Sequence, residues 1–167
     1  MNTLTRWLRH LWLDAKAAER AITKPGLKRL EQAVADSEAR HLGELRLCVE
    51  GGLPLPLLLR RVSPRARALD LFSHLRVWDT EHNNGVLIYL LLAERRIEIL
   101  ADRGLHAHVS AEYWGKLSQQ LSAHLRQGHV EQGLMEALLS VGALLKAHYP
   151  AGQQSNTNEL PNAVVLL

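Results

Sequence analysis

The chain has 167 residues, 47% of them hydrophobic, which is typical of one globular domain and argues against a disordered chain. Its formal charge of +3 is unevenly distributed. Residues 1–67 contain 13 Lys/Arg and 7 Asp/Glu, whereas residues 68–167 contain 7 Lys/Arg and 10 Asp/Glu. The basic surplus lacks a nucleic-acid-binding motif, so we expect no nucleic-acid partner. A single cysteine, Cys48, excludes an internal disulfide and fits a reducing compartment.

Residues 1–22 are predicted to form one amphipathic helix. Its apolar residues recur at helical spacing, with Arg6, Arg9 and Lys16 at other angles. The apolar positions are Leu4, Leu8, Leu11, Ala15, Ala18 and Ile22, beside Trp7 and Trp12. One interpretation packs this stripe on the domain or on a second copy of the chain. The other lays it in a membrane interface, where tryptophan and basic residues are favoured.

Localisation is predicted to be cytoplasmic, or peripheral to the inner membrane. Arg6 and Arg9 interrupt any signal-peptide core, and no apolar run approaches the roughly 20 residues that span a bilayer.

Residues 23–150 alternate helical and strand patterns, which predicts an α/β domain. Ser63-Pro64 is typical of a helix start, and Asn83-Asn84-Gly85 of a turn before a buried strand. The predicted elements are a helix over 27–40, a strand over 44–50, an extended loop over 51–61, a helix over 64–77, a hairpin of 86–92 with 95–101, a helix from Ser110 to Gly128 and a helix over 130–148. Residues 151–167 are predicted to be a flexible tail, with Val164–Leu167 either an extra edge strand or a docking tag.

The predicted hairpin and crossover bring acidic loops to one end of the sheet. In a hairpin, the loop before the first strand meets the loop after the second, which places Asp79 and Asn84 near Asp102. A right-handed strand–helix–strand crossover makes the first two strands parallel, so Glu44 joins them. Carboxylate and carbonyl oxygens suit Ca²⁺ or Mg²⁺. The sequence therefore predicts a metal site at Glu44, Asp79 and Asp102.

Sequence motifs for catalysis are absent, so the catalytic residues stay unknown and no organic cofactor is expected. The sequence contains no glycine-rich dinucleotide fingerprint, P-loop, nucleophile elbow or paired-histidine zinc helix. His106 and His108 alone are typical of surface histidines.

The segment from about Leu27 to Pro150 resembles the TPM-domain family. The resemblance lies in Gly43-Glu44-Leu45-Arg46-Leu47, the helix after Pro64, the run from Asn83 to Ile88, Asp102-Arg103-Gly104, and Leu125 followed by Gly128 and Gly133. It implies a three-layer α/β/α sandwich with a small mixed sheet, here after an N-terminal amphipathic helix. In this family some bacterial members bind a divalent metal in acidic loops, and a plant thylakoid-lumen member has weak acid phosphatase activity. The resemblance implies Asp79, Asn84 and Asp102 as metal-loop candidates in this chain, with Glu44 matched more loosely. Many members also carry a signal peptide, a transmembrane helix and a glycine-rich tail, which we do not find here.

The resulting functional hypothesis is a non-catalytic binding or adaptor module that holds Ca²⁺ or Mg²⁺ and binds an unidentified protein partner. One alternative is a weak metal-dependent phosphatase, in which Arg103 would bind the phosphate. The other is membrane-surface attachment or self-association into a homo-oligomer through residues 1–22.

Overall fold

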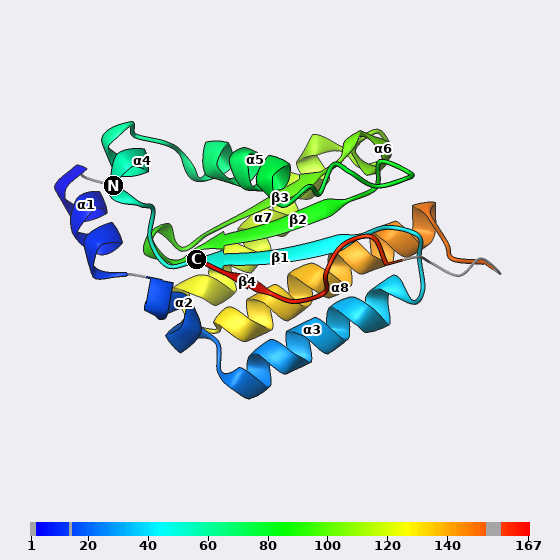
Figure 1. Ribbon diagram of the computed structural model, residues 1–167, viewed down its shortest axis with the longest axis horizontal. Coiled ribbons are helices and arrows are strands. Elements are labelled where there is room, and N and C mark those ends of the chain that lie inside the picture. Colours follow the sequence, from blue (N-terminus) through cyan, green and yellow to red (C-terminus); the bar gives the residue numbers. More distant parts are fainter. Residues whose placement is uncertain (1–2, 14, 153–157) are drawn as a thin grey trace.

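The computed structural model describes residues 3–13, 15–152 and 158–167. It is a four-stranded mixed sheet with helices on both faces (Figure 1). The helices are α1 (Thr3–Trp12), α2 (Ala15–Ala21), α3 (Lys24–Glu38), α4 (Leu55–Leu59), α5 (Pro64–His74), α6 (Arg103–His106), α7 (Ala111–Arg126) and α8 (Val130–His148), with a short 3₁₀ turn over Leu92–Glu94. The strands are β1 (Leu45–Glu50), β2 (Val86–Leu91), β3 (Arg96–Ala101) and β4 (Val165–Leu166).

The sheet has the strand order β3-β2-β1-β4, so β3 and β4 are the edge strands. β1 runs parallel to β2, with Leu45 opposite Val86, and β2 and β3 form the antiparallel hairpin, with Val86 opposite Ala101. The parallel crossover and the hairpin predicted from the sequence are therefore confirmed. Arg95 turns the hairpin with a φ of 50°, in the left-handed region that few non-glycine residues adopt.

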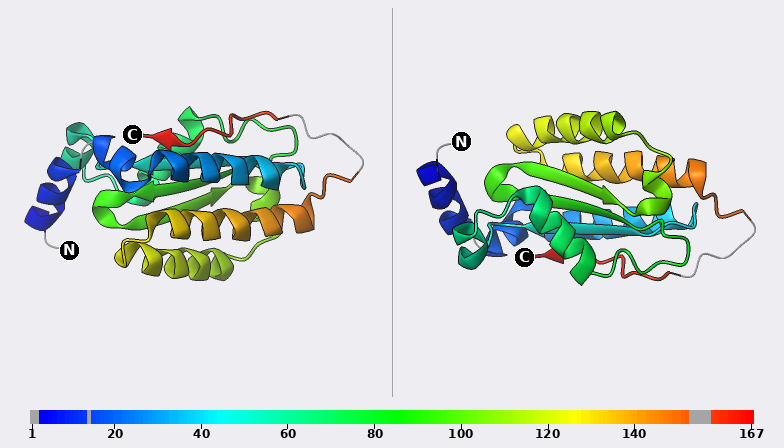
Figure 2. Two further views of the ribbon diagram at one scale, coloured as in Figure 1. Left: turned by 90° about the horizontal axis from the view of Figure 1, so that it is seen from below. Right: turned by 90° about the horizontal axis from the view of Figure 1, so that it is seen from above.

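Three helices, α3, α8 and α7, lie side by side on one face of the sheet (Figure 2). Alternate strand residues point into this layer because successive side chains on a strand face opposite sides. The core on this face includes Leu45, Leu47, Val49, Val86, Ile88, Leu90, Ile97 and Ile99, packed on helix residues such as Leu30, Leu121 and Leu138. This is the larger hydrophobic core of the domain.

The opposite face of the sheet carries a smaller core under α4, α5 and the C-terminal segment. Its strand residues are Cys48, Leu87, Tyr89, Leu91 and Leu100, and Leu58, Ala68, Leu71 and Leu160 cover them. Both faces of β2 are buried, which explains why Val86–Leu91 is a continuous apolar run. The three-layer α/β/α sandwich predicted from the sequence is confirmed.

The N-terminal segment differs from the single helix expected over residues 1–22. It forms two helices, and Leu13 N donates the last hydrogen bond of α1, to Arg9 O. Residues 1, 2 and 14, and the side chains of Leu4 and Ala15, lie outside the described residues. Residues 51–61 also differ, because Leu55–Leu59 forms the short helix α4. Pro56 is tolerated there because it occupies the first turn, where a helix needs no backbone N–H donor.

The last ten residues pack along β1 and do not form the free tail expected over 151–167. β4 runs parallel to β1, with Val165 opposite Cys48, and Leu167 N donates to Val49 O at 3.0 Å. Of the two alternatives for Val164–Leu167, the structure shows the edge strand. Residues 153–157 lie outside the described residues. No helix in the described part of the chain is both long and apolar enough to span a bilayer.

Candidate functional site

The predicted site residues Glu44, Asn84 and Asp102 meet at the end of the sheet where β1 and β2 begin. Val86 N donates to Glu44 O at 2.8 Å, and Asp102 N donates to Gly85 O at 2.9 Å, which joins the three loops through the backbone. A Cβ atom at Gly85 would collide with the carbonyl oxygen of Val77, so only glycine fits this position. The convergence expected from the hairpin and the crossover is present for these three residues.

Structural contacts already engage most of the predicted ligands. The buried Glu44 carboxylate accepts a hydrogen bond from Leu160 N at 3.1 Å, and Asn84 Nδ2 donates to Leu42 O at 2.9 Å. Asp102 begins α6, where its Oδ1 accepts from Arg103 N at 2.7 Å. Asp79 is exposed on the surface.

Two oxygen atoms at this end of the sheet are buried without a hydrogen-bond partner among the described residues: Asn84 Oδ1 and Asp102 Oδ2. Amide and carboxylate oxygens are the ligands that Ca²⁺ and Mg²⁺ take in proteins, so their chemistry fits such a cation. However, the described residues contain no cluster of three or more His, Cys, Asp or Glu side chains that could hold a metal. A cation here would therefore rely on amide and backbone oxygens, and metal binding stays a prediction.

Arg103, the predicted phosphate ligand, directs its guanidinium to Asn83, whose Oδ1 accepts from Nε at 3.0 Å and from a terminal nitrogen at 2.8 Å. The histidines of the same loop are exposed, and the His108 ring stacks on His148 with centroids 4.9 Å apart. Phosphate binding by Arg103 also stays a prediction.

A buried acid–histidine pair lies behind this end of the sheet. Glu38 Oε1 accepts from Leu45 N at 2.8 Å, and burial, reinforced by the nearby Glu44 charge, raises the Glu38 pKa to about 8. His41 contacts Ser37 Oγ at 2.9 Å and Gly43 O at 3.0 Å, and burial lowers its pKa to about 4. The sequence analysis did not predict the perturbed pKa of either residue.

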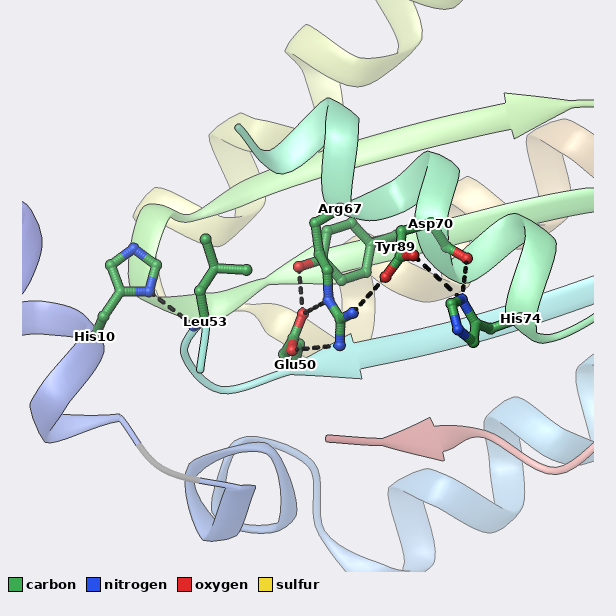
Figure 3. A network of polar contacts seen from close by, with 7 residues as sticks. All are labelled: His10, Glu50, Leu53, Arg67, Asp70, His74 and Tyr89. Atoms are coloured by element: carbon green, nitrogen blue, oxygen red, sulfur yellow. Dashed lines mark hydrogen bonds and ion pairs between the residues drawn. The ribbon is translucent and has the colours of Figure 1, made fainter. Parts of the chain in front are cut away.

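A second buried polar network, at the opposite end of β1, was not predicted from the sequence (Figure 3). Arg67 donates two hydrogen bonds to the Glu50 carboxylate in a bidentate arrangement, each with an N–O distance of 3.0 Å. Tyr89 OH donates to the same carboxylate at 2.7 Å. Arg67 also donates to Asp70 Oδ2 at 2.7 Å. The sequence signals were a tyrosine in the apolar strand β2 and a glutamate at the end of β1.

The Glu50 network surrounds Cys48, which pairs with Tyr89 across β1 and β2. Cys48 is fully buried, and burial together with the Glu50 charge raises its pKa to about 12. A thiol with that pKa is protonated at neutral pH and is a poor nucleophile. Cys48 is therefore a structural residue.

Helix α1 is attached to the domain through its polar side chains. Arg6 Nε donates to Glu94 Oε1 at 2.8 Å, and a terminal nitrogen of Arg6 donates to Val62 O at 2.6 Å. The buried His10 contacts Glu94 Oε1 at 3.1 Å, and its Nδ1 accepts from Leu53 N at 2.9 Å. Burial raises the Glu94 pKa, but the bonds from His10 and Arg6 outweigh it and leave that pKa below its ordinary value.

The apolar side of α1 is left exposed by this mode of attachment. Leu8 is 50% exposed, Leu11 61% and Trp12 81%, and Leu8 and Trp12 line an apolar hollow with Leu13 and Arg9. Packing of the predicted stripe on the domain is therefore wrong for these three residues. It is right for Ala18 and Ile22 of the following segment, which are buried in the larger core.

Comparisons with known proteins agree with this architecture. The NMR structure of BA42 from the psychrophilic bacterium Bizionia argentinensis is 27% identical with a TM-score of 0.74, and the match covers 86% of this chain and 94% of BA42. The N-terminal domain of a protein from P. gingivalis is 21% identical with a TM-score of 0.62, covering 78% of this chain and 79% of that domain, which shows the shared fold. A search of curated proteins found no match. The family model described as the TPM domain matches residues 17–144, so the chain belongs to the TPM domain family.

Proposed function

We propose that this TPM domain is a non-catalytic binding module that attaches to an anionic membrane surface through α1. The observation that carries the proposal is the orientation of α1. Its polar residues Arg6 and His10 bind the domain, whereas Leu8, Leu11 and Trp12 are exposed. A globular domain that packs an amphipathic helix for stability alone buries the apolar side instead.

The surroundings of α1 have the charge expected for an anionic surface. Arg9, Lys16 and Arg20 are exposed on α1 and α2, and one acid, Glu19, is exposed beside them on α2. Each cation near an anionic leaflet contributes roughly 1 kcal/mol, and full burial of a leucine contributes about 1.5–3 kcal/mol. The charges and the apolar side chains therefore contribute comparable amounts. Binding should require anionic lipid and should weaken with salt.

Co-sedimentation with vesicles tests the proposal. We expect the protein to pellet with phosphatidylglycerol-containing vesicles and to stay in solution with pure phosphatidylcholine vesicles. The paired change Leu11→Ser and Trp12→Ser should lower the affinity for anionic vesicles at least about tenfold, because it removes two of the exposed apolar contacts. The matched control changes Leu139 and Trp78 to serine, since these are 53% and 52% exposed elsewhere on the surface.

Two results would contradict membrane attachment. One is equal binding of the α1 variant and the control variant. The other is a concentration-dependent dimer that the α1 variant abolishes while vesicles bind neither protein, which would assign the exposed side of α1 to self-association.

A divalent cation at the sheet end is a second candidate function, and the buried oxygens Asn84 Oδ1 and Asp102 Oδ2 favour it. Amide NMR spectra recorded during Ca²⁺ and Mg²⁺ titrations should show saturable shifts at residues 83–85 and 102–104, which Asp102→Asn weakens. Asp36→Asn, which changes an exposed carboxylate on α3, is the control. Unchanged spectra at millimolar metal would exclude the site. The phosphatase alternative depends on the same site and predicts phosphate-ester turnover that Asp102→Asn abolishes.

A further inference from the structure

The outer edge of β3 borders a groove that none of the sites above uses. The groove has a volume of about 500 Å³ and lies between β3 and α7. Among the described residues, β3 has one neighbour in the sheet, β2, so its other edge faces this space.

The hydrogen-bonding pattern of the hairpin decides which backbone groups of β3 face the groove. Asp102 N donates to Gly85 O, so in an antiparallel ladder Leu100 and Glu98 also bond to β2. The N–H and C=O groups of the alternate residues Ile97, Ile99 and Ala101 must then point outward. A hydrogen bond from Arg65 supports this assignment, because its side chain donates to the outward-facing Ile99 O at 3.0 Å.

The helical wall of the groove is formed by small side chains of α7. Ala111, Gly115, Ser118 and Ser122 recur three or four residues apart, so they lie on one side of the helix. A Cβ atom added at Gly115 would meet nothing within 4 Å. Trp114 also lines the groove, and its indole N–H is a donor without a partner among the described residues. This wall therefore leaves room beside the strand, while the indole N–H of Trp114 is itself buried.

The charge of the groove is positive. Arg65, Arg96 and Arg126 line it against a single acid, Glu98. The Glu98 carboxylate forms ion pairs with both Arg65 and Arg96, with N–O distances of 3.7 Å and 3.5 Å, so one negative charge is shared between two guanidinium groups. Both arginines remain more than half exposed. An acidic ligand fits this surface, whereas a second copy of the chain would bring its own arginines to the edge.

We propose that the groove between β3 and α7 binds an extended acidic segment of a partner protein, which adds to β3 as a further strand. Main-chain groups of the segment would pair with Ile97, Ile99 and Ala101, as in other cases of strand addition to a sheet edge. Acidic side chains of the segment would contact the arginines, and its other residues would lie against the small side chains of α7. This site is separate from α1 and does not depend on membrane attachment.

Amide NMR with two synthetic peptides tests the proposal. Both peptides are blocked at their ends and share an alternating Val/Thr sequence, with Glu at the remaining positions of one and Lys at those of the other. The Glu peptide should shift the amides of Ile97, Ile99 and Ala101 and slow their hydrogen exchange. The amides of Glu98 and Leu100 already bond to β2 and should change less. The Lys peptide should bind at least about tenfold more weakly.

Two variants of the full chain separate groove binding from surface attraction. Gly115→Leu fills the groove and should abolish the peptide shifts, and it keeps the fold because the added side chain enters open space and favours the helix. Gln120→Leu places a leucine on another exposed part of α7 and should leave binding unchanged. Shifts that survive Gly115→Leu, equal binding of the Lys peptide, or no shift at millimolar peptide would overturn the proposal. A dimer formed through β3 without peptide would also overturn it.

Discussion

Replacing Glu38 by glutamine should change how the stability of the domain depends on pH. Glu38 is 5% exposed, and its carboxylate accepts a hydrogen bond from Leu45 N. Burial, together with the negative charge of Glu44, raises its pKa from 4.5 to about 8, although the Leu45 bond and Arg46 act in the opposite direction. The folded protein therefore holds a proton on Glu38 that the unfolded chain loses at a lower pH.

The size of the effect follows from proton linkage. For a group whose folded pKa is raised, the stabilising contribution is fully present below the unfolded pKa and is lost as pH rises through the folded pKa. Here the window runs from 4.5 to about 8. Each pH unit inside it changes the free energy of unfolding by about 1.4 kcal/mol, so Glu38 should cost the wild-type protein roughly 3 kcal/mol between pH 4.5 and 7.

Urea denaturation at several pH values between 5 and 8 measures this cost. The glutamine variant keeps an oxygen for Leu45 N but does not titrate, so it should lose less stability than wild type as pH rises. His41 contributes oppositely, because its pKa is lowered to about 4 and its contribution is lost as pH falls from 6.5 towards 4. Both proteins contain His41, so their difference isolates Glu38. Glu19→Gln controls for loss of one exposed charge. Parallel pH profiles for wild type and Glu38→Gln would refute the reasoning.

Three further predictions concern the buried residues around the sheet. Arg67→Ala should lower the free energy of unfolding by about 3–5 kcal/mol, because Glu50 is 1% exposed and would keep a buried charge without its ion-pair partner. Tyr89→Phe removes one hydrogen bond to Glu50 and should lower it by about 1–2 kcal/mol. Equal urea midpoints for wild type and Arg67→Ala would contradict this. Cys48 should react with a thiol reagent at pH 8 only as fast as the protein unfolds, and rapid labelling of the folded protein would show that its pKa of about 12 and its burial are wrong. Gly85→Ala should abolish or severely weaken folding because its Cβ would meet Val77 O, and a melting temperature near that of wild type would show that the loop adapts.

The fold was predictable where the chemistry is local. The Asn83-Asn84-Gly85 turn and the apolar run after it located β2 at Val86–Leu91, and the alternation after Arg95 located β3. The strand–helix–strand order predicted the parallel pairing of β1 with β2, because a crossover helix returns the chain to the end of the sheet where the first strand began. The meeting of Glu44, Asn84 and Asp102 followed from those two pairings alone.

The rest depended on contacts between distant residues. The side of α1 that packs on the domain is set by Glu94, which lies 84 residues from His10 in the sequence, and helical periodicity cannot identify that partner. Glu50 and Arg67 were assigned to a strand and a helix, but only the tertiary structure brings them into one buried network with Tyr89. β4 has two residues, too few for a strand pattern.

The most direct measurement is the fluorescence of Trp12 as the only tryptophan. Phenylalanine replaces Trp7, Trp78 and Trp114, and the protein is mixed with vesicles that contain phosphatidylglycerol and lipids with brominated acyl chains. If α1 attaches to the membrane, the emission of the 81% exposed Trp12 should shift to shorter wavelength and be quenched by the bromine atoms. A matching protein that keeps only Trp78 should show neither change. Trp12 emission that stays at the wavelength of a water-exposed indole in the presence of these vesicles would contradict membrane attachment through α1.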